Sequence, residues 1–214
     1  MSQLDELEGV RRLRSGVLLL ILIPVIILIL ALVGAAAIYA AVMSASVSSY
    51  TGSSLAADVT VLAVALALVS LVLTVMAFGR LRGGFSLLSA AGRGSSIGVT
   101  GAWLVLIAAI IALPGAALLM FVSFIVSSIT SVIGNAGYVL IGKGLYDVGL
   151  SYGKDSLKTG GALVAISFAV VLLLIFMITS FIGLILSYTT LGDIERELQA
   201  KASQGGAQLA TTTS

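Results

Sequence analysis

The sequence predicts an all-α fold: a polytopic transmembrane bundle of five, alternatively six, helices, with a cytoplasmic N-terminus and short interfacial amphipathic segments. Three observations predict it. The 214 residues are 59% hydrophobic and 9% charged, whereas a soluble domain is about 45–50% apolar and about 25% charged. The mean hydropathy is +1.21. Uncharged runs recur along the chain that are long enough to form membrane-spanning helices.

The ends of the chain differ from its middle. Residues 1–15 carry acids, arginines and apolar residues at roughly helical spacing, and are expected to form a cytoplasmic or interfacial amphipathic lead. Two interpretations of the lead stay open: a helix lying among lipid headgroups, or a solvated helical extension of the first span. Residues 16–198 are expected to form a single transmembrane bundle, and residues 199–214 a flexible tail.

Turn and capping residues divide the bundle. Asp58 is a suitable N-cap for the second span, and Pro114-Gly115 supplies a turn inside the longest uncharged run. Alternatively, Pro114 kinks one longer helix and the turn falls near residues 127–131. The last uncharged run has no turn chemistry near its middle and is expected to form one long tilted helix. The expected spans are residues 16–43, 59–79, 97–113, 116–142 and 159–192, with polar loops at 44–58, 80–96 and 143–158.

The charges test this topology. All eleven Lys and Arg residues fall into four clusters. The first three clusters lie on one side of the membrane, which the positive-inside rule makes the cytoplasm. The fourth, Arg196 with Lys201, lies outside in a five-helix arrangement and inside in a six-helix arrangement. The cations therefore favour six spans, whereas the length of the last run favours five.

Composition excludes several function classes. The sequence contains no His and no Cys, which removes thiolate metal sites, disulfides, and catalysis or proton transfer by His. No Asp, Glu, Lys or Arg lies inside an apolar run, which argues against proton coupling, membrane hydrolysis and phosphotransfer. The net charge of +2 comes without an aromatic-interleaved basic patch, which argues against nucleic-acid binding. We therefore expect a non-enzymatic protein without cofactor or metal.

Membrane lipids are the expected partners, with other membrane subunits or a second copy of the chain as further partners. Arginines beside the apolar runs are candidate contacts for anionic headgroups at the cytoplasmic face. These candidates are Arg11, Arg12, Arg14, Arg80, Arg82 and Arg93.

A polar stripe crosses one of the apolar runs. Ser123, Ser127, Ser131 and Asn135 recur every fourth residue and share one face of a helix. One interpretation is the wall of a passage for water or a small neutral solute. The other, which we favour, is hydrogen bonding between packed helices.

A spacing of the form G-x5-[ST]-G-x2-L occurs three times, beginning at Gly9, Gly94 and Gly153. Each copy lies where a polar segment enters an apolar run. One interpretation is a triplicated helical hairpin, which would favour six spans. The other is that Gly with Ser or Thr commonly marks helix entries, in a chain that has 24 glycines.

Two stretches carry a family resemblance. They are LEGVRRLRSGVLLL at residues 7–20 and the segment from residue 144 to 199. The most specific pattern is Y-x2-G-x2-Y-G-x4-K-x-G-G at residues 146–161. Together they resemble a family of archaeal integral membrane proteins known only as a domain of unknown function. The resemblance implies an archaeal plasma-membrane protein and no particular activity, so no functional residue is carried over.

The sequence thus favours a multi-pass plasma-membrane protein that acts as a structural, accessory or assembly subunit. The alternative is a channel or facilitator for a small neutral solute, motivated by the polar stripe and the repeated spacing.

Overall fold

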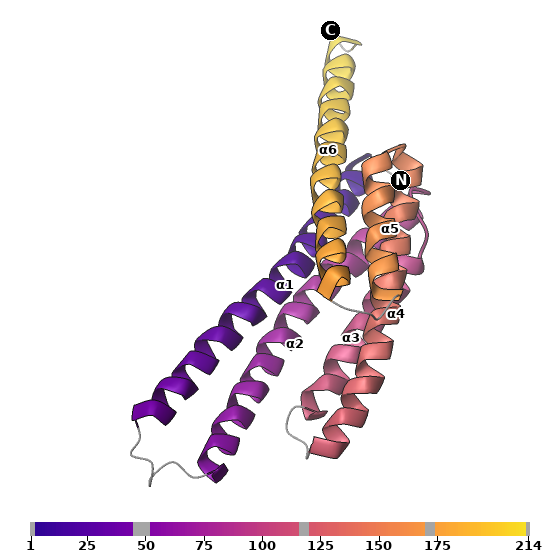
Figure 1. The fold of residues 1–214 in the computed structure, drawn as a ribbon. Helices are drawn as coiled ribbons and strands as arrows, with labels where there is room; N and C mark the ends of the chain where they lie inside the picture. Colours follow the sequence, from indigo (N-terminus) through magenta and orange to yellow (C-terminus); the bar gives the residue numbers. More distant parts are fainter. Residues whose placement is uncertain (1–2, 45–51, 116–119, 170–173, 213–214) are drawn as a thin grey trace.

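The structure, a computed structural model, describes residues 3–44, 52–115, 120–169 and 174–212. These residues form six α-helices, with short turns at residues 91–96 and 153–154. Successive helices run in opposite directions, so the first and last helices carry the two termini to the same end of the molecule (Figure 1). The helices are α1 (Gln3–Ser44), α2 (Gly52–Ala90), α3 (Ile97–Gly115), α4 (Met120–Tyr152), α5 (Asp155–Ala169) and α6 (Leu174–Thr212).

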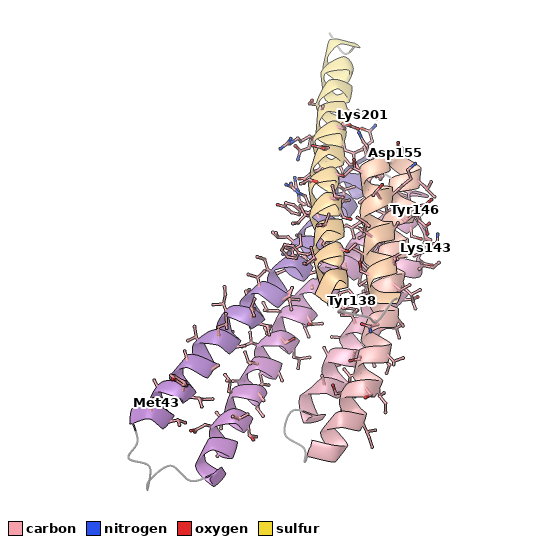
Figure 2. The ribbon with its side chains drawn as sticks, viewed as in Figure 1. Met43, Tyr138, Lys143, Tyr146, Asp155 and Lys201 are labelled. Carbon is pink, nitrogen blue, oxygen red and sulfur yellow. The ribbon has the colours of Figure 1, made fainter. Side chains whose placement is uncertain are left out.

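The helices form a closed ring. Each helix packs against its neighbours in the chain, and α1 also packs against α6. The ring is made of three antiparallel hairpins: α1–α2, α3–α4 and α5–α6. We call the end that carries all eleven Lys and Arg residues the polar end, and the end that carries Met43 the far end (Figure 2). Toward the far end, the α1–α2 and α3–α4 hairpins diverge (Figure 1).

The buried core lies toward the polar end. Leu13, Phe85, Leu145, Leu157 and Leu191 are at most 1% exposed and come from five different helices. The far half is different, because large apolar side chains on α1, α2 and α4 face outward there. Three helical segments are long and apolar enough to cross a membrane, and only 22%, 11% and 17% of their most apolar windows is buried inside the chain. These segments are Gln3–Ala40, Ala57–Ala90 and Ile125–Tyr152.

Glycines bring the helices into backbone contact. A Cβ atom added to Gly142 of α4 would lie 2.6 Å from the carbonyl oxygen of Gly161 on α5. A Cβ atom added to Gly160 of α5 would lie 2.7 Å from the carbonyl oxygen of Gly183 on α6. Because backbone atoms cannot rotate away, these contacts fix the spacing between the helices.

The repeated G-x5-[ST]-G spacing maps onto the three hairpins. Its second glycine is Gly16 on α1, Gly101 on α3 and Gly160 on α5. An added Cβ would lie within 2.6–2.8 Å of an atom of the partner helix of the same hairpin in each case. The spacing therefore marks one close contact within each hairpin.

Several expected loops are helical. The expected lead at residues 1–15 is not a separate interfacial segment from residue 3 onward, because α1 runs unbroken from Gln3 to Ser44. The expected loop at residues 80–96 is helical to Ala90 and turns at Gly92, whose φ is 70°. The expected loop at 143–158 is helical to Tyr152 and turns at Gly153, whose φ is 63°. Packing of these segments into the core outweighs their charge and glycine content.

The chain from residue 159 to 192 is not one helix. α5 ends at Ala169 and α6 begins at Leu174, and the two pack side by side, with Gly160 against Gly183. In a continuous helix these two glycines would be about 35 Å apart at about 1.5 Å per residue. The expected tail differs as well, because α6 continues to Thr212. The Pro114-Gly115 pair does fall at a helix boundary, since α3 ends at Gly115 and α4 begins at Met120.

Candidate functional site: the ion-paired polar end

The first and last helices are joined by a shared carboxylate. Nε of Arg11 lies 3.2 Å from one oxygen of Glu195 on α6, and Nη1 of Arg14 lies 3.1 Å from the other. The Glu195 side chain is 12% exposed. The guanidinium of Arg14 also packs against the Tyr188 ring, with Cζ 4.7 Å from its centroid. One largely desolvated carboxylate therefore pairs with two cations and closes the ring.

A second shared carboxylate joins α1 to the α2–α3 turn and to α4. Arg93 donates from Nε to Glu6 over 2.8 Å, and the Tyr152 hydroxyl donates to the same oxygen over 2.7 Å. The Arg93 guanidinium also lies 5.4 Å from the centroid of the Tyr152 ring. Ser151 donates from its hydroxyl to the Arg93 carbonyl oxygen over 2.8 Å, which fixes the turn against α4.

Further ion pairs extend this arrangement. Lys154 pairs with Glu197 and so links the end of α4 to α6. Lys143 pairs with Asp147, whose other oxygen accepts a hydrogen bond from Ser95. The polar end is thus held together by charged contacts between elements far apart in the sequence.

A small pocket of about 150 Å³ opens among these groups. That volume holds about five water molecules. Its walls combine carboxylates, cations and apolar side chains, so it has no single charge preference. Among the described residues, no group of three or more acidic residues is placed to hold a metal ion. The lining residues are Glu6, Arg93, Ser151, Tyr152, Ile194, Glu197, Leu198 and Lys201.

The six arginines predicted to contact headgroups separate into two classes. Four are paired with carboxylates of the same chain: Arg11 and Arg14 with Glu195, Arg12 with Glu8, and Arg93 with Glu6. Arg80 and Arg82 are exposed on α2, and within the described parts of the chain neither forms an ion pair. Sequence inspection alone did not single out Glu6 and Glu195 as partners, because they lie 87 and 181 residues from Arg93 and Arg14.

Arg82 lies over an aromatic pair. Its Cζ atom is 5.5 Å from the centroid of the Trp103 ring on α3. The ring of Phe78 meets that of Trp103 edge to face, with centroids 4.6 Å apart and an interplanar angle of 61°. These contacts join α2 to α3.

Part of the polar stripe faces outward. Ser127 and Ser131 are exposed and Asn135 is half-buried, whereas the side chain of Ser123 lies outside the described residues. Asn135 is seven residues before Gly142 and shares the face of α4 that contacts α5. α5 ends at Ala169. The stripe therefore lies on the part of this α4 face that extends past the end of α5. The packing role favoured from sequence stays a prediction.

A family model described as "Protein of unknown function (DUF973)" matches residues 6–214, almost the whole chain. No curated protein and no solved structure matches the chain.

Proposed function

Because this chain belongs to the DUF973 family of proteins of unknown function, we propose its role from its own geometry: a non-enzymatic, multi-pass protein of the archaeal plasma membrane that serves as a structural, accessory or assembly subunit. One observation carries the proposal. The three apolar segments are long enough to cross a membrane, yet at most 22% of their apolar windows is buried inside the chain. The far half therefore offers lipid and other subunits a large apolar surface.

Charge supports an orientation with the polar end in the cytoplasm. All eleven Lys and Arg residues belong to the polar end, whereas the far end holds Asp58 and no cation within its described residues. Both termini then lie on the cytoplasmic side, as the positive-inside rule favours. Aromatic rings beside Arg14, Arg82 and Lys143 are typical of a membrane interface.

The third hairpin enters the membrane without crossing it in this proposal. The uncharged part of α5, from Thr159 to Ala169, covers about 16 Å at about 1.5 Å per residue. The hydrocarbon core is about 30 Å thick. Figure 1 supports this interpretation, because α5 ends and α6 begins well above the far ends of the other two hairpins.

The test is to identify what covers the exposed apolar surface. A photo-crosslinking residue at Val132, which is 70% exposed, is expected to capture a protein subunit in native membranes. The same residue at the fully buried Leu145 serves as the control and captures only the chain itself. Intact-mass measurement of the complex in mild detergent then gives the stoichiometry. A lone monomer whose Val132 position crosslinks only to lipid would overturn the subunit role.

The polar stripe favours a second candidate, a facilitator for a small neutral solute. Ser131 is exposed on the face of α4 that continues beyond the end of α5, which leaves a polar surface inside the bilayer. In proteoliposomes, Ser131→Leu would then abolish solute flux, whereas Val132→Leu on the neighbouring exposed position would not. Absence of flux in the unaltered protein would exclude this candidate.

A further inference from the structure

We propose that the outward surface between α2 and α3, which we call the α2–α3 groove, binds one anionic phospholipid, with its phosphate at Arg82 and a hydrocarbon chain descending beside Trp103. The inference rests on the proposed membrane location and deepens it, because it assigns a headgroup site to one arginine. The sequence suggested six arginines, and the structure separates them by their partners.

The first argument is charge. Four of the six arginines are paired with carboxylates of the chain, and Arg82 is exposed with no ion pair to any described residue. An unneutralised guanidinium next to an apolar surface favours a phosphate, to which it can donate more than one hydrogen bond.

The second argument is preorganisation. The guanidinium of Arg82 lies over the Trp103 ring at 5.5 Å, within the range of a cation–π contact. Phe78, one turn before Arg82 on the same helix, also contacts Trp103, edge to face. Trp103 is 42% exposed, so its indole also borders the groove. A Trp placed beside a cation is typical of the boundary between headgroups and hydrocarbon.

The third argument is the shape of the groove below Arg82. On α2, Gly79, Val75 and Val72 follow Arg82 along one helical face toward the far end. A Cβ added to Gly79 would meet no atom within 4 Å, and Val75 and Val72 are 48% and 59% exposed. On α3, Ile107 and Ile110 are 41% and 53% exposed.

These exposed apolar side chains continue the α2–α3 contact at Phe78 and Trp103 toward the far end. In a bilayer, a lipid hydrocarbon chain lying along this surface contacts the exposed side chains of both helices. The phosphate of the headgroup thus contacts Arg82, and the hydrocarbon chain of the same lipid contacts the apolar side chains below it.

A second copy of the chain fits the groove less well. Every acidic residue of the polar end already has a partner within the chain, so a second copy brings no unengaged carboxylate to Arg82. The phosphate of an anionic lipid supplies that charge directly.

Trp103 is the only Trp in the chain and reports on this groove alone. The protein is reconstituted into phosphatidylcholine vesicles that contain a small, fixed fraction of either brominated phosphatidylglycerol or brominated phosphatidylcholine. Bromine on the acyl chains quenches indole fluorescence on contact. We expect the brominated phosphatidylglycerol to quench Trp103 more strongly than brominated phosphatidylcholine at the same mole fraction.

The matched variants are Arg82→Gln and Arg80→Gln. Both remove an exposed arginine without an ion pair from α2, and two residues along a helix place Arg80 on a different face. The preference for phosphatidylglycerol is expected to fall about tenfold in Arg82→Gln, the effect of losing one charged hydrogen bond, and to change less than twofold in Arg80→Gln. Each variant is compared with its own unquenched emission, because Arg82 itself touches the indole.

Equal quenching by the two lipids, or an equal effect of the two substitutions, overturns the proposal while leaving the membrane location intact. Absence of quenching by either lipid in protein that stays with the vesicles shows that another protein segment covers the groove, and overturns it too. Failure of the protein to insert is separate: alkaline carbonate would then extract it from the vesicles, which contradicts the proposed function itself.

Discussion

Nη1 of Arg14 on α1 lies 3.1 Å from Oε2 of Glu195 on α6, although 181 residues separate the two in the chain. The pair joins the first helix to the last and completes the ring. Its carboxylate is 12% exposed and also accepts Arg11 and the Gln199 amide. Much of the stability of the polar end therefore depends on a single acid.

Glu195→Gln is expected to destabilise the protein by about 2–3 kcal/mol, because two partly desolvated arginines lose their only counterion. Nε of Arg14 is already buried without a hydrogen-bond partner. Unfolding by denaturant titration in detergent micelles measures the change. The control is Glu8→Gln, which breaks an exposed pair with Arg12 and should cost less than about 0.5 kcal/mol. Equal losses in the two variants would contradict the role of Glu195.

The hydrogen bond from Tyr152 to Glu6 links α4 to α1. Tyr152→Phe removes only the hydroxyl and is expected to lower the unfolding free energy by about 1.5 kcal/mol, since the acceptor is charged and partly buried. Tyr39→Phe changes an aromatic residue that is 67% exposed and should leave stability within about 0.5 kcal/mol. The same titration compares them, and a neutral Tyr152→Phe would show that the bond contributes nothing.

Helix spacing gives a prediction with a control on the same helix. Gly142→Ala places a methyl group 2.6 Å from backbone atoms of α5, so α4 and α5 must separate. We expect a loss of about 2 kcal/mol or more. Gly134→Ala places its methyl 3.5 Å from the Ala108 side chain, an ordinary contact, and should be neutral or stabilise by up to about 1 kcal/mol through helix propensity. Melting temperatures in detergent distinguish the two.

The direction of α6 predicts the side of the C-terminal segment. The chain has no native Cys, so single-Cys variants at Gln3, Met43 and Ser203 can be labelled cleanly. In right-side-out vesicles, an impermeant maleimide is expected to label Met43→Cys only. Gln3→Cys and Ser203→Cys should react only after the vesicles are opened. Labelling of Ser203 together with Met43 would instead support the five-helix topology.

The sequence was informative where local chemistry decides the structure. Pro114-Gly115 lies at the end of α3 because proline and glycine disfavour continuation of a helix. The separation of α5 from α6 was missed because residues 170–173 are Val, Val, Leu and Leu, which carry no turn signal. That hairpin depends on backbone contact between Gly160 and Gly183, a tertiary interaction.

The sequence predicted which arginines belong to the candidate site, but it did not predict which carboxylates they pair with. The arginines at the helix entries were recognised, but a single sequence does not show which of them meet carboxylates. Glu6 lies 87 residues from Arg93, and only the folded ring brings them together. Arg82 differs from its neighbours through Trp103, which lies on another helix. The sequence thus supplied the charges, and tertiary structure assigned their partners.

The α1–α6 contact can form only late in the synthesis of the chain. Synthesis proceeds at about 5–20 residues per second, so with 181 residues between them Arg14 waits about 10–35 s for Glu195 to leave the ribosome. Throughout that interval the helix ring of the nascent protein is open, and Arg11 and Arg14 lack their carboxylate partner. Quality-control proteases and insertion factors therefore act on a protein whose helix ring is still open. A chain that ends before residue 195 lacks Glu195 and cannot form the pair that closes the ring.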